Sequence, residues 1–207
     1  MKRIFALLFS IALMLSLLPG CGLLAETELA DPEPEAGQPE DAEAPPEPEG
    51  SKAVTLVFAY EQDDGHTDLL EAASQIADSK GYTLSTVESL GNHELQNRFI
   101  GLAREAGEQA ILIELADPAR AAEAVEAAGE MAVVFVNTAP DSNSVLGKRS
   151  VFVGNPEGEG ELYLRLTGRT AMRAADNLIR GVATDEETEL KLSGHKISIP
   201  ADGVLEP

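Results

Sequence analysis

The feature that most constrains the fold is a regular alternation of apolar runs with amphipathic segments. Four runs are rich in aliphatic and β-branched residues and predict strands: residues 53–60, 82–87, 110–115 and 131–136. Three segments between them have apolar residues at helical spacing: residues 67–80, 92–107 and 117–129. This succession of βαβ units over about 85 residues predicts an α/β fold with a doubly wound, mostly parallel sheet. The second run is shorter and alternates with polar residues, as expected of an outer strand.

The ends of the expected helices carry their own signals. Gly81 and Gly107 are expected to end the first and second helices. Asn92 is expected to cap the second helix, and Asp117 followed by Pro118 the third. Four apolar residues are expected to line the second helix: Leu95, Phe99, Leu102 and Ala106.

The remainder of the chain predicts a long helix and a terminal hairpin. The helix is expected over residues 160–179, with Gly168 as a candidate kink position. Residues 189–200 alternate on both sides of Ser193-Gly194, which is a hairpin signal. Residues 52–207 are therefore expected to form one domain.

The N-terminus has the order of an export signal. Met1-Lys2-Arg3 is cationic, and the 15 uncharged residues from Ile4 to Leu18 are too few to cross a bilayer core of roughly 30 Å. The following Leu18-Pro19-Gly20-Cys21 resembles the lipobox of bacterial lipoproteins, in which the signal is cut before a Cys that then receives lipid. We expect residues 1–20 to be a signal peptide. Lipid on Cys21, with acyl chains such as palmitate, would anchor the protein at the extracytoplasmic face of the cell membrane. An uncleaved anchor and a buried free thiol are the alternatives.

An acidic, proline-rich segment follows. Residues 26–50 contain ten acids and six prolines but no Lys or Arg, so residues 21–51 are expected to form a disordered linker. Recruitment of a basic partner by this segment is the alternative. The formal net charge of −21 argues against nucleic acid as a partner.

Three stretches of the domain, residues 110–119, 130–137 and 151–155, occur in a characteristic order and spacing, together with Gln96 in the second helix. They resemble the type I periplasmic binding proteins, especially the galactose- and ribose-binding receptors of ABC transporters. Members of that family have two lobes, whereas this chain has room for one. The resemblance therefore implies a reduced member that binds a small polar ligand, such as a monosaccharide.

The resemblance also implies site residues beyond the ends of the strands. They are Tyr60, Gln62, Asp64, Asn137, Thr138 and Asn155. The carboxyl ends of the strands are where open α/β sheets bind ligands.

Structural roles compete with binding for several polar residues. Asp63, Asp64 and Asp68 also suit the N-terminus of a helix. Asn137 also suits a turn before Pro140, and both roles stay open. The three histidines, His66, His93 and His195, are expected to be solvated or to cap helices rather than to bind a metal. The run Asp141-Ser142-Asn143 is expected to form a turn rather than a calcium loop.

Catalytic motifs are absent from the sequence. It has no Gly-x-Ser-x-Gly elbow and no Walker loop, and its single Cys is the expected lipid anchor. We therefore expect no enzyme activity, no cofactor and no metal. Two functions stay open: a solute-binding lipoprotein that serves an ABC permease, and a tethered interaction or sensory module that acts with a membrane sensor.

Overall fold

The computed structural model describes residues 51–61 and 63–205. The expected signal peptide, Cys21, the linker up to residue 50 and Gln62 lie outside the described residues. The strands are β1 Ser51–Phe58, β2 Thr83–Glu88, β3 Glu108–Ile113, β4 Ala132–Val136, β5 Ser150–Gly154, β6 Leu192–Ser193 and β7 Lys196–Ser198. The helices are α1 Asp64–Lys80, α2 His93–Glu105, α3 Ala121–Ala128 and α4 Glu161–Arg180, with short 3₁₀ turns at Pro118–Arg120 and Asn143–Val145.

The strands form one seven-stranded sheet in the order β2-β1-β3-β4-β5-β7-β6. Every neighbouring pair from β2 to β7 is parallel, and only β6 runs antiparallel to its neighbour. The predicted α/β class with a mostly parallel sheet is confirmed. The expected outer strand, β2, lies at one edge of the sheet.

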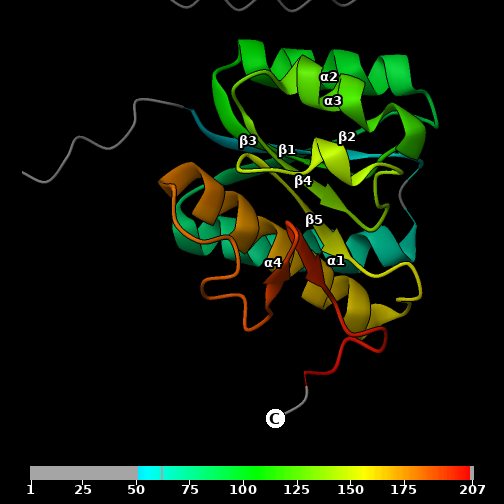
Figure 1. The fold of residues 1–207 in the computed structure, drawn as a ribbon, viewed down its shortest axis with the longest axis vertical. Helices are drawn as coiled ribbons and strands as arrows, with labels where there is room; N and C mark the ends of the chain where they lie inside the picture. Colours follow the sequence, from blue (N-terminus) through cyan, green and yellow to red (C-terminus); the bar gives the residue numbers. More distant parts are fainter. Residues whose placement is uncertain (1–50, 62, 206–207) are drawn as a thin grey trace, which may run out of the picture. The chain divides into compact units, whose positions relative to one another are not determined.

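Helices cover both faces of the sheet. In Figure 1, α2 and α3 lie on one face, and α1 and α4 lie on the other. Alternate residues of β1 serve the two layers: Leu56 packs in the cluster that includes Met172 of α4, and Val57 packs in the cluster that includes Ile100 of α2. Burial of β1 on both faces explains its continuous apolar sequence.

The helix ends follow the sequence signals closely. Asn92 caps α2 by accepting hydrogen bonds from the backbone N–H groups of Glu94 and Leu95, at 2.9 and 3.0 Å. Gly81 ends α1 in the left-handed conformation. The expected apolar lining of α2 is wrong at Leu102, whose side chain is 51% exposed. Ile100 is buried on the sheet side of this helix instead.

Gly168 lets two helices approach each other. It is buried within α4, and a methyl group at this position would overlap the backbone carbonyl of Leu69 in α1. Helix α4 continues through Gly168 as one element from Glu161 to Arg180. The glycine is therefore needed for close packing of α1 against α4, rather than for the kink suggested by the sequence.

The C-terminal hairpin is part of the sheet. Its turn is formed by Gly194 and His195, both with positive φ, which is the pattern of a type I′ turn. Strand β7 pairs with β5 in parallel, through Ile197 opposite Val153. Since Ile197 is fully buried, the last strand extends the core.

Among the described residues, none of the helices combines the length and apolar character needed to cross a membrane. Nor do residues 51–61 and 63–205 gather three or more His, Cys, Asp or Glu side chains into a group able to hold a metal ion.

Candidate functional site

The carboxyl ends of β1, β3 and β4 lie at the same edge of the sheet, because these strands are parallel neighbours. Polar side chains follow each of them. Glu114 directly follows β3 and Asn137 directly follows β4, while His66 lies in the first turn of α1, which follows β1. We call Glu114, His66 and Asn137 the edge cluster.

Glu114 is the centre of the edge cluster. Its Oε2 atom accepts hydrogen bonds from the backbone N–H of Ala59 at 3.2 Å and from Nε2 of His66 at 3.1 Å. Its Oε1 atom accepts a longer bond, of 3.4 Å, from Nδ2 of Asn137. The residue is only 8% exposed. These three donors hold a buried carboxylate in one position and join the ends of three strands.

Gln96 of α2 holds the backbone next to Glu114 through two hydrogen bonds. Its Nε2 atom donates to the backbone carbonyl of Glu114 at 2.8 Å, and its Oε1 atom accepts from the backbone N–H of Ala116 at 3.3 Å. Gln96 is buried, so both ends of its amide satisfy backbone groups of the loop after β3. The side chain fixes the backbone that carries Glu114.

Asp63 and His66 form a capping box at the start of α1. The Asp63 carboxylate accepts from the backbone N–H of His66 at 3.0 Å, and the Asp63 backbone N–H donates to Nδ1 of His66 at 3.2 Å. The bond from His66 N–H is the main reason that the pKa of Asp63 is below its ordinary value. Because Nδ1 accepts this hydrogen bond, the neutral imidazole carries its hydrogen on Nε2, which donates to Glu114. The capping role expected for this histidine is confirmed, and it also orients the edge cluster.

Asn137 has two unusual properties. Its φ angle of 58° lies in the left-handed region, which costs less for Asn than for other residues with a side chain. Its Oδ1 atom is buried and has no hydrogen-bond partner among the described residues. A buried acceptor without a donor costs roughly 1–3 kcal/mol. The edge cluster therefore contains one buried carbonyl oxygen that lacks a donor among the described residues.

Tyr60 lies beside this cluster and is open to solvent. Its side chain is 60% exposed, and its ring lies against Gly91, where an added methyl carbon would be 3.1 Å from Cε1. Leu90, next to Gly91, is 66% exposed. Two large apolar side chains, one aromatic and one aliphatic, are thus exposed at the carboxyl edge of β1 and β2.

The other predicted site residues differ in solvent exposure and in whether their side chains already form hydrogen bonds. Asp64 is exposed in the first turn of α1, and Thr138 is half-buried beside Asn137. Asn155, at the end of β5, uses both ends of its amide: Nδ2 donates to the carbonyl of Ile199 at 2.9 Å, and Oδ1 accepts from Glu157 N–H at 3.0 Å. Asn155 therefore fastens the segment after β7 to the end of β5.

The sequence interpretation missed Glu114 as a member of the site. The residue was included in an apolar strand, residues 110–115, although it is the only charged side chain in that run. A carboxylate in a strand that is otherwise fully buried requires local donors. This requirement was the signal that could have identified it.

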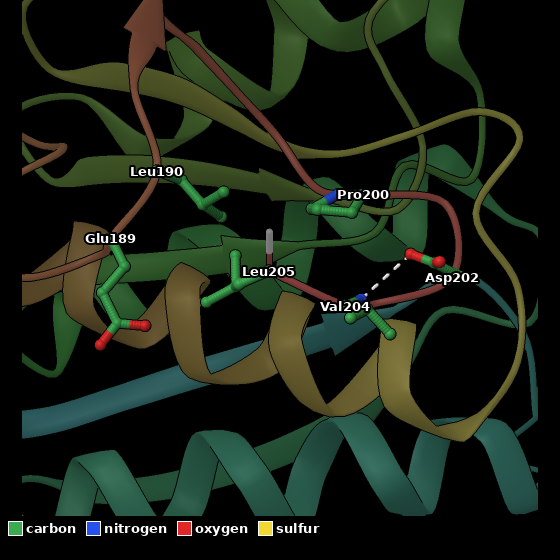
Figure 2. A pocket seen from close by; sticks show the side chains of 6 residues that line it. All are labelled: Glu189, Leu190, Pro200, Asp202, Val204 and Leu205. Atoms are coloured by element: carbon green, nitrogen blue, oxygen red, sulfur yellow. Dashed lines mark hydrogen bonds between the residues drawn. The ribbon is translucent and has the colours of Figure 1, made fainter. Parts of the chain in front are cut away.

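The described cavities lie away from the edge cluster. One, of about 710 Å³, is lined by Glu189, Leu190, Pro200, Asp202, Val204 and Leu205. Figure 2 shows the segment from Pro200 to Leu205 along one side of it, and the Asp202 carboxylate accepts from Val204 N–H at 3.1 Å. The lining of this cavity is mainly apolar, and one of its two acids, Asp202, already accepts a hydrogen bond. We assign the site to the edge cluster because polar groups from three strand ends converge there.

No protein-family model matches the chain, and no curated protein matches it. The solved structures that resemble it include the following two. One is a chain of the complex between the TorS sensor domain and TorT in the absence of ligand, with 20% identity, a TM-score of 0.43, and coverage of 49% of this chain and 36% of that one. The other is an ABC transporter solute-binding protein from Mycobacterium smegmatis with bound glycerol, with 18% identity, a TM-score of 0.43, and coverage of 73% and 56%. The chain thus spans 36% and 56% of the lengths of these proteins.

Proposed function

We propose that the domain is a solute-binding lobe that takes a small polar ligand, such as a monosaccharide, at the edge cluster. The observation that carries the proposal is the buried Oδ1 atom of Asn137, which has no donor although it lies beside an organised carboxylate. A ligand hydroxyl that donates to Oδ1 would recover the free energy lost by the unpaired acceptor. The left-handed backbone of Asn137 is the kind of local strain found at binding sites.

Each member of the site would have a different task. Glu114 already accepts three hydrogen bonds, so it would orient Asn137 and His66 rather than provide the main contact. Tyr60 would lie against the apolar face of a sugar ring, since its own ring is exposed. Asp64 and Thr138 flank the cluster and would accept from further hydroxyls.

Titration of the full-length protein in detergent with a panel of monosaccharides tests the proposal. Asn137→Gly removes the amide and keeps a backbone that tolerates positive φ, so we expect affinity to fall by about tenfold without loss of fold. Asn143→Gly, in the same connection between β4 and β5, is the matched control, because Asn143 is exposed. Saturable binding that survives Asn137→Gly unchanged would contradict the site, and the absence of saturable heat from all sugars would contradict the ligand class.

We further propose that the lobe is displayed outside the cell on lipid attached to Cys21 and that it serves an ABC permease. The apolar segment ending at Leu18-Pro19-Gly20-Cys21 supports the anchor. The proposed role is binding without catalysis, supported by the lack of a recognisable nucleophile motif in the sequence. A single lobe leaves one side of the ligand in water, so affinity would be weak unless a partner supplies the second wall.

The exposed pair Tyr60 and Leu90 favours a second candidate, a tethered interaction or sensory module. Large exposed apolar side chains beside a polar cluster suit contact with a protein partner at this same edge. Purification from membranes distinguishes the two candidates. A membrane protein that copurifies with the parent chain and is lost with Tyr60→Ser, together with a flat response to sugars, supports the module. Saturable sugar binding supports the solute-binding lobe.

A further inference from the structure

Two charged side chains without an ion-pair partner among the described residues, Glu108 and Arg104, lie at the amino edge of the sheet, opposite the edge cluster. They line a hollow of about 620 Å³, within the usual size range of small-molecule sites. Glu108 is the first residue of β3, Arg104 is near the end of α2, and Leu178 and Ile179 are near the end of α4. The hollow is therefore separated from the edge cluster by the length of the strands.

Only one of the two carboxylate oxygens of Glu108 has a hydrogen-bond partner. Its Oε1 atom accepts from Oγ1 of Thr55 at 2.9 Å, whereas its Oε2 atom is buried without a partner. Burial raises the pKa of Glu108, against the lowering effect of the bonds from Thr55. Within the described residues, no cation forms an ion pair with this carboxylate.

Arg104 provides the opposite charge. Its Nη1 atom donates to the backbone carbonyl of Ala127 at 2.8 Å, near the end of α3. Its side chain lies against Gly129, where an added methyl carbon would be 3.2 Å from Cδ. The guanidinium is thus held in place by backbone, and the described residues give it no carboxylate partner.

The remaining lining is apolar or already paired. Arg149 and Glu130 form an ion pair with each other, so they add no net charge. Met131, Leu178 and Ile179 supply aliphatic surface. The hollow therefore combines one unmatched anion, one unmatched cation and an apolar wall.

We propose that this hollow binds a small zwitterion with an apolar side chain, of the chemical class of the apolar amino acids. The ammonium group of the ligand contacts Glu108, its carboxylate contacts the Arg104 guanidinium, and its side chain lies against Leu178 and Ile179. Charge-assisted bonds of this kind are the strong ones in a partly desolvated site. The proposal is independent of the polar-solute site at the edge cluster.

Calorimetric titration of the full-length protein in detergent with L-leucine tests the proposal. Two analogues each keep one charge: n-pentylamine and 4-methylpentanoate. We expect saturable binding of L-leucine and at least about tenfold weaker binding of either analogue. Glu108→Gln and Arg104→Gln are each expected to weaken L-leucine binding by about tenfold or more. The matched controls, Glu105→Gln and Arg98→Gln, change exposed residues outside the hollow and should bind L-leucine as the parent does.

The analogues distinguish the loss of one contact from a general loss of folded protein, because each variant should still bind the analogue that does not contact the replaced residue. Glu108→Gln should still bind 4-methylpentanoate as the parent does, and Arg104→Gln should still bind n-pentylamine as the parent does. The proposal is overturned by no saturable heat with L-leucine up to about 10 mM, by an analogue that binds as tightly as L-leucine, or by unchanged binding in both lining variants. Asn137→Gly should leave L-leucine binding intact, so failure of the edge cluster and failure of this hollow are distinguishable.

Discussion

Two glutamates at the ends of β3 show how the same residue type takes different roles. Glu114, at the carboxyl end, accepts three hydrogen bonds, and Glu108, at the amino end, accepts one and has a buried oxygen without a partner. Hydrogen bonds hold the first carboxylate in place, whereas burial raises the pKa of the second, so that ionisation of Glu108 costs folding free energy. Glu108 therefore lowers the stability of the fold at any pH at which its carboxyl is ionised.

Replacement of Glu108 by Gln should raise the stability of the unliganded protein near neutral pH. Burial raises the pKa of Glu108 above its ordinary value of 4.5, so the folded state is favoured when the carboxyl is protonated, and this advantage is lost as the pH rises through the raised pKa. Gln is neutral at every pH, so its benefit should be largest at neutral pH and should disappear well below 4.5. Thermal unfolding across this pH range measures the difference. If Glu108→Gln raised the stability equally at neutral pH and well below pH 4.5, ionisation of Glu108 would not be the cause of the gain.

The family resemblance predicted Asn137, a member of the edge cluster, and its neighbour Tyr60 as site residues. The structure places both at the carboxyl edge of the sheet. The hydrogen bonds that organise the cluster were not predictable, because they link residues 48 and 23 positions apart in the chain. Glu114 was hidden within a strand, and no local pattern links it to His66.

At the scale of elements, the tightest helix contact depends on one residue. Helices α1 and α4 cover the same face of the sheet (Figure 1), and Gly168 brings α4 against the backbone of Leu69. We expect Gly168→Ala to destabilise the fold by about 1–3 kcal/mol, because the methyl group overlaps a backbone carbonyl that cannot move without its helix.

Chemical denaturation measures this loss. Gly101→Ala is the matched control: Gly101 is also within a helix, but an added methyl carbon there meets no other atom within 4 Å. Since Ala has the higher helix propensity, the control should be neutral or more stable than the parent. A loss of equal size in both variants would exclude the helix contact as the cause.

The order of helices and strands was largely predictable, because each has a local period and local end signals such as Asn92 and Gly81. The place of the last strand was not. The hairpin signal near Ser193-Gly194 is local, but the pairing of β7 with β5 depends on an edge formed more than 40 residues earlier. Leu102 shows the same limit: helical spacing alone did not reveal which side of α2 faces the sheet.

At the scale of the whole molecule, the chain enters the sheet at the amino end of β1, opposite the edge cluster. The chain that precedes Ser51 therefore joins the domain at the edge of the sheet away from the proposed solute site.

Cys21→Ala should release the protein from the membrane fraction, because no thiol remains to carry lipid. Fractionation of cells that express the parent and the variant measures the change, with His93→Ala as a control outside the proposed lipobox. Retention of Cys21→Ala in the membrane fraction would indicate an uncleaved apolar segment or a protein partner as the anchor.

The position of β7 has a consequence for biosynthesis. Residues 196–198 complete the pairing of β5, a strand made from residues 150–154, so β5 stays an edge strand until they have been synthesised. A polypeptide released before Ile197 would expose an unpaired apolar edge, which favours aggregation.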